Sequence, residues 1–369
     1  MNSKSLNIVL VSTPIGYIGS GKGGGVELTL ISLIRGLISL GHKVTLVAPE
    51  KSYLPSDCLG VEIKYVIGRD QLSWQHQQKE GPIEIPLGGV LPKLWEKTFE
   101  IAHNSDAILN FGYDWLPLWI TRFVDLKIFH LISMSNESDV MKNIIKDLSK
   151  THLHRLAFHS SRQASDYELE DHPTIVGNGF DLARYKFQSK TEGPLGWIGR
   201  VAPEKGLEDA VRVAEALGEK LLVWGLMEDK NYADRVNSLF PKKIINYRGF
   251  LSTDSLQKEI GTCRALINTP KWKEAYGNVL IEAMACGVPV VSYDRGGPGE
   301  LIDQGFNGFL VPPDDIDSMI LSVSKVNSID RRNCRLWVEK SASKEVFAKK
   351  IEKWILEGLS EDLNNYQST

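Results

Sequence analysis

The sequence predicts an α/β fold with two Rossmann-like, doubly wound domains that face a central cleft. The first observation is length, because 369 residues exceed what one hydrophobic core usually organises. The second is that short β-branched runs alternate with helical patterns, which is typical of parallel sheets built from βαβ units. This alternation occurs twice along the chain, so we expect one doubly wound sheet in each half.

The first half contains apolar, β-branched runs that predict buried parallel strands. These strands are expected at residues 7–13, 43–49, 107–111 and 127–132. An amphipathic helix is predicted over 26–40, where Leu30, Leu33 and Leu37 share one face. Residues 70–105 are less regular and rich in Gln, Pro and Gly, and a long functional loop region is predicted there.

The second half repeats the pattern of strands and helices. Its strands are expected at residues 195–199, 220–225, 243–249, 264–269 and 288–293. The segment NGFDLARY, residues 178–185, is predicted to cross between the halves. We therefore expect an N-terminal domain over 1–180 and a C-terminal domain over 181–342, with the helical end of the chain, within 343–369, as a candidate to pack back on the first domain.

Composition excludes several classes of function. The 43 basic and 46 acidic side chains leave a net charge of -3, which gives no nucleic-acid footprint. The four cysteines are scattered without the paired spacing of a zinc site or a redox dithiol, and are expected to be reduced thiols in the cytoplasm. The start of the chain is polar and passes into a strand without a signal peptide, and no run of eighteen apolar residues predicts a membrane span.

The run GYIGSGKGGGVELTL follows the first strand and opens the first helix, so its backbone N–H groups can converge on one ligand. Residues 19–24 also fit G-x-G-x-x-G, which leaves a nicotinamide-dependent oxidoreductase open, although Glu50 lies further on than the usual ribose partner. Residues 16–23 nearly fit a Walker A loop but lack its Ser or Thr. A tight turn without a ligand, or a nucleotide-binding protein without catalysis, are further alternatives.

The run GWIGRVAPEKG places Arg200 and Lys205 just after a strand of the second half. Open α/β sheets bind ligands at the carboxyl ends of their strands, and these two cations suit a diphosphate. A lone arginine and lysine would otherwise be solvated surface residues.

The run KWKEAYGNVLIEAMACGVPVV predicts a loop, a helix that begins near Asn278, and a buried strand. The helix N-terminus offers N–H groups and a partial positive charge to the same diphosphate. Glu282 on this helix is placed to accept both hydroxyls of a ribose, and Glu274 in the loop is placed where a transferred group would lie. The alternative is a helix with two surface acids. The glycine turn GGPGE, residues 296–300, before another helix favours a binding site.

These motifs together resemble the retaining family 4 glycosyltransferases, which have the GT-B fold of two Rossmann-like domains, and the likeness covers nearly the whole chain. It is carried by GGGVE, SRQASDYE (161–168), VGNGFD (176–181), GRVAPEKG, the pair Glu274 and Glu282, and the glycine turn before Glu300. The resemblance implies an N-terminal acceptor domain and a C-terminal nucleotide-sugar domain. It also implies transfer with retention of configuration by same-face attack, without a metal ion or other cofactor.

Carried over to matching positions, the resemblance implies a role for each site residue. Arg200 and Lys205 would contact the donor phosphates, Glu282 the ribose and Glu274 the transferred sugar, and His130 would lie near a far hydroxyl of that sugar. These five include the candidate catalytic residues Glu274, Arg200, Lys205 and His130. The remaining candidate donor-binding residues are Gly24, Gly25, Tyr276, Gly277, Asn278 and Val279. Ala275 and Tyr276 depart from the usual family pattern, which bears on the identity of the sugar. For His130, a hydrogen-bonded place in the core is the alternative.

Within this family the chain is similar to the cyanobacterial UDP-glucose:tetrahydrobiopterin glucosyltransferases, through STPIGYIGSGKGGGVELTL, LNFGYDWLPLW, HLISM and TPKWKEAYGNV. The likeness implies UDP-glucose as donor and a reduced pterin as acceptor, with a membrane lipid or a glycan as rivals. The candidate acceptor-binding residues are Glu27, Tyr113, Asp114 and Trp115, with Trp74 and Trp119 as further aromatic surfaces for a flat ring. Aromatic residues in an apolar run are otherwise core residues. No metal site is predicted, because residues 315–317, the one D-x-D string, are better explained as the start of a helix.

Overall fold

The structure is a computed structural model of the chain and describes residues 5–20, 24–72, 85–190, 192–240 and 244–367. The contacts divide the chain into two compact units. Unit 1 comprises Met1–Gly179 together with Lys344–Thr369, and unit 2 comprises Phe180–Ser343. These limits differ by one residue from those expected at 180 and 342.

Unit 1 is built on a parallel sheet that has seven strands in the described residues. In spatial order they are β3 (Glu62–Val66), β2 (Lys43–Pro49), β1 (Asn7–Val11), β4 (Ala107–Asn110), β5 (Ile128–Ile132), β6 (Leu156–Phe158) and β7 (Thr174–Ile175). Every pairing between neighbours is parallel, and β1 pairs with both β2 and β4. The strand order therefore reverses direction beside β1.

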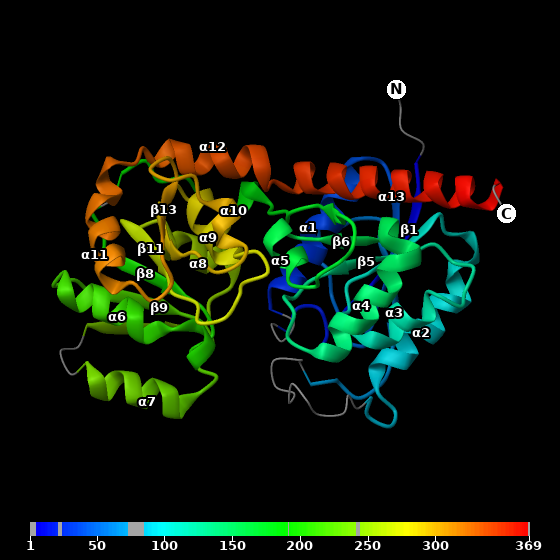
Figure 1. Cartoon of the computed structure of the whole chain (residues 1–369), viewed down its shortest axis with the longest axis horizontal. Helices are drawn as coiled ribbons and strands as arrows, with labels where there is room; N and C mark the ends of the chain where they lie inside the picture. The colour runs from blue at the N-terminus through cyan, green and yellow to red at the C-terminus, as the bar shows by residue number, and fades with distance from the viewer. Residues whose placement is uncertain (1–4, 21–23, 73–84, 191, 241–243, 368–369) are drawn as a thin grey trace. The chain divides into compact units, whose positions relative to one another are not determined.

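Helices cover both faces of this sheet (Figure 1). They are α1 (Gly25–Ser39), α2 (Val90–Ile101), α3 (Trp115–Ile120), α4 (Asp139–His152), α5 (Ser161–Ser165) and α13 (Lys344–Gln367). Successive side chains of a strand point to opposite faces. Accordingly, Ile8 and Leu10 of β1 pack with α1 and α13, whereas Val9 and Val11 pack with α2. The last helix of the chain thus completes the core of the first unit.

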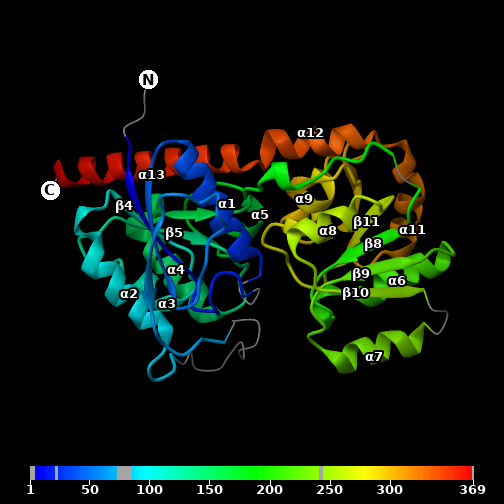
Figure 2. The ribbon, with the colours of Figure 1, turned by 180° about the vertical axis from the view of Figure 1, so that it is seen from behind.

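Unit 2 repeats the design with six parallel strands in its described part. Their order is β10 (Ile245–Gly249), β9 (Leu221–Trp224), β8 (Leu195–Ile198), β11 (Ala265–Asn268), β12 (Val290–Tyr293) and β13 (Gly308–Val311). Its helices are α6 (Leu207–Ala216), α7 (Lys230–Leu239), α8 (Thr253–Ile260), α9 (Asn278–Ala285), α10 (Pro298–Leu301), α11 (Ile316–Lys325) and α12 (Arg331–Ser341). One cluster joins the sheet to α6, α7 and α11 and another joins it to α8, α9 and α12, so both faces are covered (Figure 2).

The predicted doubly wound α/β architecture with two sheets is confirmed. The predicted long loop over 70–105 is wrong in part, because 90–101 form α2, whose Val90, Leu91 and Leu94 are buried against the sheet. The interpretation of residues 315–317 as a helix start is confirmed, since the Asp315 side chain accepts a hydrogen bond from the backbone N–H of Ser318 at 2.9 Å and caps α11.

Candidate nucleotide-sugar site

The strand order locates one candidate site in unit 2. The order reverses beside β8, which pairs with β9 on one side and β11 on the other. Ligands of open α/β sheets bind outside the carboxyl ends of the strands at such a reversal. The segments that follow β8 and β11 lie at this edge, and they carry Arg200, Lys205 and Glu274.

Glycines let these two segments approach each other closely. The carbonyl oxygen of Gly206 accepts a hydrogen bond from Thr269 Oγ1 at 2.7 Å. A Cβ atom on Gly206 would lie 2.0 Å from the carbonyl oxygen of Thr269, and this residue has a left-handed φ of 64°. A side chain at this position would therefore push the two segments apart. The close approach brings Lys205 against Glu274.

In this arrangement both predicted cations contact carboxylates. Lys205 Nζ donates to Glu274 Oε1 at 2.6 Å. Arg200 donates to Glu228 through Nη1, and its Nη2 lies 2.7 Å from Glu204 Oε1. Nη2 is buried and makes no hydrogen bond of good geometry within the described residues. Arg200 is therefore paired with two carboxylates, and an anionic ligand would compete with them for its guanidinium group.

Trp272 joins these side chains, although the sequence did not single it out. Its indole N–H donates to Glu274 Oε1 at 2.8 Å, and Lys205 Nζ lies 4.3 Å from the centre of its ring. The Arg200 guanidinium carbon lies 5.8 Å from the same centre. Both distances are in the range of cation–π contacts. The sequence did carry a signal for Trp272, since an aromatic residue stands two positions before Glu274. In an extended segment, residues two positions apart have their side chains on the same side.

Glu274 is largely buried, with 16% of its side chain exposed. Burial opposes ionisation, but the Lys205 ammonium and the Trp272 N–H outweigh it, so the pKa of the Glu274 carboxyl group lies below its usual value. Both donors use Oε1. No hydrogen bond to Oε2 is formed by the residues that the structure describes. The Glu274 carboxylate is thus ionised. Its Oε1 accepts two hydrogen bonds, and its Oε2 remains available to a ligand.

The segment before α9 packs against the glycine turn 296–297. The N–H of Gly297 donates to the carbonyl oxygen of Glu274 at 2.7 Å, and a Cβ atom on Gly297 would lie 2.3 Å from the carbonyl oxygen of Tyr276. α9 then begins after Gly277, whose φ is 113°. Its first turn contains Asn278 and Val279, and its end carries the partial positive charge of a helix N-terminus. Tyr276 itself is buried.

Glu282 lies further along α9 and is also buried. Tyr185 Oη donates to its Oε1 at 3.1 Å, a contact that the sequence did not predict. Burial raises the pKa of Glu282 to about 7, against the smaller opposing effects of the Tyr185 hydroxyl and the Arg184 charge. Its charge therefore changes near neutral pH.

In unit 1 the glycine-rich segment after β1 is fastened by Glu27. The Glu27 carboxylate accepts hydrogen bonds from the Gly19 N–H at 2.7 Å and from Ser20 Oγ at 3.1 Å. Gly24 precedes α1 with a φ of 55°, and Gly25 is its first residue. Glu27 was predicted to bind the acceptor substrate, and in the structure its carboxylate holds the turn before α1. Residues 21–23, which belong to both glycine motifs, lie outside the described residues.

His130 lies in β5 and is completely buried. Asn110 Nδ2, whose amide orientation is fixed by two hydrogen bonds with Gly112, lies 3.1 Å from His130 Nδ1. Thr121 Oγ1 donates to Pro117 and lies 2.8 Å from His130 Nε2. These partners imply a neutral ring with its proton on Nε2. Burial lowers the pKa of His130 to about 3, which agrees with this. Both nitrogens are thus used inside the unit, and the predicted contact with a sugar stays a prediction.

The structure places two of the predicted acceptor residues in the interior with partners of their own. Tyr113 is buried, and its hydroxyl lies 2.8 Å from that of Tyr167. Asp114 is completely buried, caps α3 through the Leu116 N–H at 3.3 Å and accepts from Gln71. Burial raises the pKa values of both groups. Both residues thus have the interior position that was the alternative to ligand binding for this apolar run.

Trp115 is half-buried, and Trp119 is 45% exposed. These two rings keep surface that a ligand can reach. Trp74, the third tryptophan of the predicted acceptor region, lies outside the described residues.

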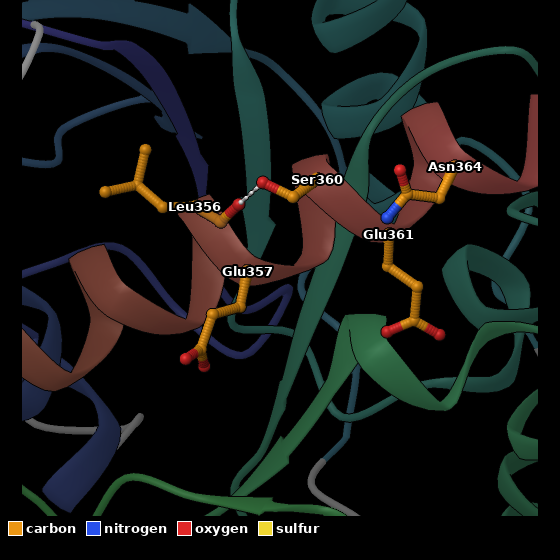
Figure 3. A pocket seen from close by; sticks show the side chains of 5 residues that line it. All are labelled: Leu356, Glu357, Ser360, Glu361 and Asn364. Carbon is orange, nitrogen blue, oxygen red and sulfur yellow. Dashed lines mark hydrogen bonds between the residues drawn. The ribbon is translucent and has the colours of Figure 1, made fainter.

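Other features of the described residues offer less chemistry. They contain no group of three or more His, Cys, Asp or Glu side chains placed to hold a metal ion. They contain no helix that is both long and apolar enough to span a bilayer. A hollow on α13 is lined by Leu356, Glu357, Ser360, Glu361 and Asn364, and Ser360 bonds back to its own helix (Figure 3). It offers no cation to a phosphate.

Comparison with known proteins shows what the chain is similar to. Residues 186–336, which include the segments around Arg200 and Glu274, match the family described as glycosyl transferases group 1. An uncharacterized glycosyltransferase of Methanocaldococcus jannaschii is 30% identical over 380 residues, covering 88% of this chain and 90% of the relative. The capsular polysaccharide biosynthesis glycosyltransferase CapM of Staphylococcus aureus is 26% identical over 220 residues, covering 51% of this chain and 56% of CapM.

Solved structures share the fold. HepE of Anabaena, in complex with UDP and glucose, has a TM-score of 0.72 at 17% identity, covering 94% of this chain and 98% of HepE. AviGT4, a glycosyltransferase involved in avilamycin A biosynthesis, also has a TM-score of 0.72 at 17% identity, covering 96% of this chain and 98% of its own. These likenesses show the GT-B fold of two Rossmann-like domains.

Proposed function

The chain belongs to the group 1 glycosyltransferases, and we propose that it transfers glucose from UDP-glucose to a small acceptor, with retention of configuration and without a metal ion. The observation that carries this proposal is the grouping of Arg200, Lys205, Trp272 and Glu274 at the point in unit 2 where the strand order reverses. HepE, which shares the fold, was solved with UDP and glucose, which supports UDP-glucose as the donor.

The leaving group of such a transfer is a nucleoside diphosphate, whose negative charge grows as the bond to the sugar breaks. Arg200, Lys205 and the N-terminus of α9 would stabilise that charge, because each is fixed before the reaction begins. One such preorganised donor typically contributes ~3 kcal/mol to a transition state. The cations would then do the work that a divalent ion does in other transferases.

The two glutamates would take different parts of the donor. Glu274, ionised and open at Oε2, would accept a hydrogen bond from a hydroxyl of the transferred glucose. Glu282 would accept the two ribose hydroxyls once it is ionised, with Tyr185 holding one of its oxygens. Glu274 thus positions the sugar and is not a covalent nucleophile. The leaving phosphate would help take the proton of the acceptor during same-face attack.

A reduced pterin is the acceptor that we propose, on the sequence likeness to the tetrahydrobiopterin glucosyltransferases. Trp115 and Trp119 offer rings for stacking, whereas Tyr113 and Asp114 have internal partners and would act by supporting α3. A glycan acceptor is the rival, because CapM acts in capsular polysaccharide biosynthesis.

The test is a panel of nucleotide sugars crossed with acceptors, with products identified by mass spectrometry and anomeric configuration by NMR. We expect a glucosylated pterin of retained configuration and release of UDP in the presence of a chelator. Glucosylation of glycans alone would reject the pterin, and loss of all transfer on chelation would reject the metal-independent mechanism. In thermal-shift measurements, UDP and UDP-glucose should stabilise the protein at concentrations where NAD and ATP do not.

A further inference from the structure

We propose that Trp272 is a positioning residue for sugar transfer, whose ring supports Lys205 and Arg200 and whose N–H keeps Glu274 in place while the donor binds. This inference rests on the proposed function and assigns a role to Trp272, which the proposed function left without one. Trp272 would act through its three neighbours.

The geometry gives Trp272 two separate contacts with the site. The face of its ring lies 4.3 Å from Lys205 Nζ and 5.8 Å from the Arg200 guanidinium carbon. The edge of the same ring donates to Glu274 Oε1 at 2.8 Å. An indole is the side chain that combines an electron-rich face with an N–H donor at its edge. Phenylalanine keeps the face alone, and leucine keeps neither.

The two contacts matter because Lys205 has two tasks that conflict. When no nucleotide sugar is bound, the Lys205 ammonium pairs with Glu274 at 2.6 Å. When a nucleotide sugar binds, the ammonium would turn to its diphosphate. When the ammonium leaves, Glu274 loses its strongest partner and, by electrostatics, would be drawn after it. The Trp272 N–H bonds to the same oxygen and remains, so Oε2 stays directed to the sugar. The Trp272 ring would meanwhile keep a cation–π contact with the Lys205 ammonium as the ammonium moves.

Trp272 owes its position to the backbone and not to a core. The loop before it is held by Arg295 Nη1, which donates to the Pro270 carbonyl at 2.8 Å, and by the Lys271 N–H, which donates to the Glu204 carbonyl at 2.8 Å. The Trp272 side chain is half-buried and belongs to none of the hydrophobic clusters of the described residues. Its replacement should therefore leave unit 2 folded.

The test compares Trp272→Phe and Trp272→Leu with Trp337→Phe, a control on α12 where a half-buried tryptophan of the same unit is changed in the same way. For Trp272→Phe we expect the Kd for UDP to stay within about twofold, because the ring face is kept. Its kcat should fall about tenfold, and the pKa of Glu274, followed by NMR of its carboxyl carbon, should rise by about one unit, because Glu274 has lost a hydrogen bond to its charged form. Trp272→Leu should in addition weaken UDP binding.

A kcat of Trp272→Phe equal to that of the wild type would overturn the proposal, as would an equal loss of kcat in Trp337→Phe. If the wild-type protein transfers no sugar, the proposed function fails by itself. Trp272 is then judged by NMR titration of the Glu274 carboxyl carbon in the ligand-free protein, with Glu274→Gln for assignment. A pKa of Glu274 that is the same in wild type and Trp272→Phe would refute the contact.

Discussion

The hydroxyl of Tyr185 donates a hydrogen bond to Glu282 across the interior of unit 2, at 3.1 Å. The two residues lie far apart in the sequence, one at the start of the unit and the other on α9. Their contact holds a carboxyl group in surroundings that oppose its charge, and burial raises its pKa to about 7. A binding site that uses this carboxylate is therefore sensitive to pH near neutrality.

We expect Glu282→Gln to be more stable than the wild type at pH 8, by roughly 5 °C in Tm. The pKa of Glu282 is higher in the folded chain than in the unfolded one, so the stability linked to its proton is complete below about 4.5 and is lost as pH rises through about 7. Glutamine cannot ionise and keeps that stability. Calorimetry at pH 5 and pH 8 checks this, with exposed Glu357→Gln as the control; a variant less stable than the wild type at pH 8 contradicts it.

Arg200→Ala and Lys205→Ala should each lower turnover about a hundredfold or more, because each removes a fixed positive charge from the diphosphate. Steady-state rates with UDP-glucose, without added metal, measure the effect. Arg332→Ala, an exposed arginine on α12, should retain normal turnover. Near-normal rates in either of the first two variants would remove that residue from the proposed site.

Glu228→Gln should bind UDP more tightly than the wild type, by about threefold to tenfold. Glu228 accepts a hydrogen bond from Arg200 and neutralises part of its charge, and glutamine would leave that charge for the ligand. Titration calorimetry at two salt concentrations gives the affinity and its screening. Glu339→Gln, which alters the ion pair of Arg335 on α12, should leave UDP affinity unchanged. Weaker UDP binding in Glu228→Gln would show that Glu228 supports Arg200 instead of competing for it.

Glu27→Ala should loosen the turn before α1 without altering UDP binding to unit 2. The variant removes both acceptors that hold the Gly19 N–H and the Ser20 hydroxyl. Amide hydrogen exchange over residues 16–20 should accelerate, and transfer should fall. Unchanged exchange together with a raised KM for the acceptor would instead favour direct contact with the acceptor, as the sequence predicts.

The sequence predicted most of the fold because buried parallel strands are continuous apolar runs, as in β1 and β2. It missed β3, an edge strand with Glu62 and Lys64, and β13, which lies at the edge of the second sheet. It also missed β6, a three-residue strand, and β7, a two-residue strand whose pairing depends on β6. It missed α2 because Pro, Gly and Gln before it obscure a helix that a buried apolar face defines. Local pattern is weak wherever tertiary pairing decides the structure.

The residues of the candidate site also fall into those that the sequence predicted and those that it did not. Arg200, Lys205 and Glu274 were predicted because motifs near strand ends indicate which edge of a sheet they occupy. Trp272 and Tyr185 were not, because their roles depend on the path of a loop and on packing across the unit. Tyr113 and Asp114 were predicted to bind the acceptor, but an apolar run with polar members fits both a ligand site and an interior hydrogen-bond network. The contacts of Tyr113 with Tyr167 and of Asp114 with Gln71, which the sequence does not reveal, favour the interior network.

The chain leaves unit 1 after Gly179 and re-enters it at Lys344, so unit 2 interrupts unit 1 in the sequence. The core of unit 1 includes Phe347, Ile351 and Trp354 of α13, and the Trp354 N–H donates to the His154 carbonyl at 2.8 Å. During synthesis unit 2 is thus complete while unit 1 still lacks these side chains. A nascent chain paused before residue 344 would expose the apolar flank of α1 to chaperones or to aggregation, whereas unit 2, which is continuous, has every residue it needs to fold.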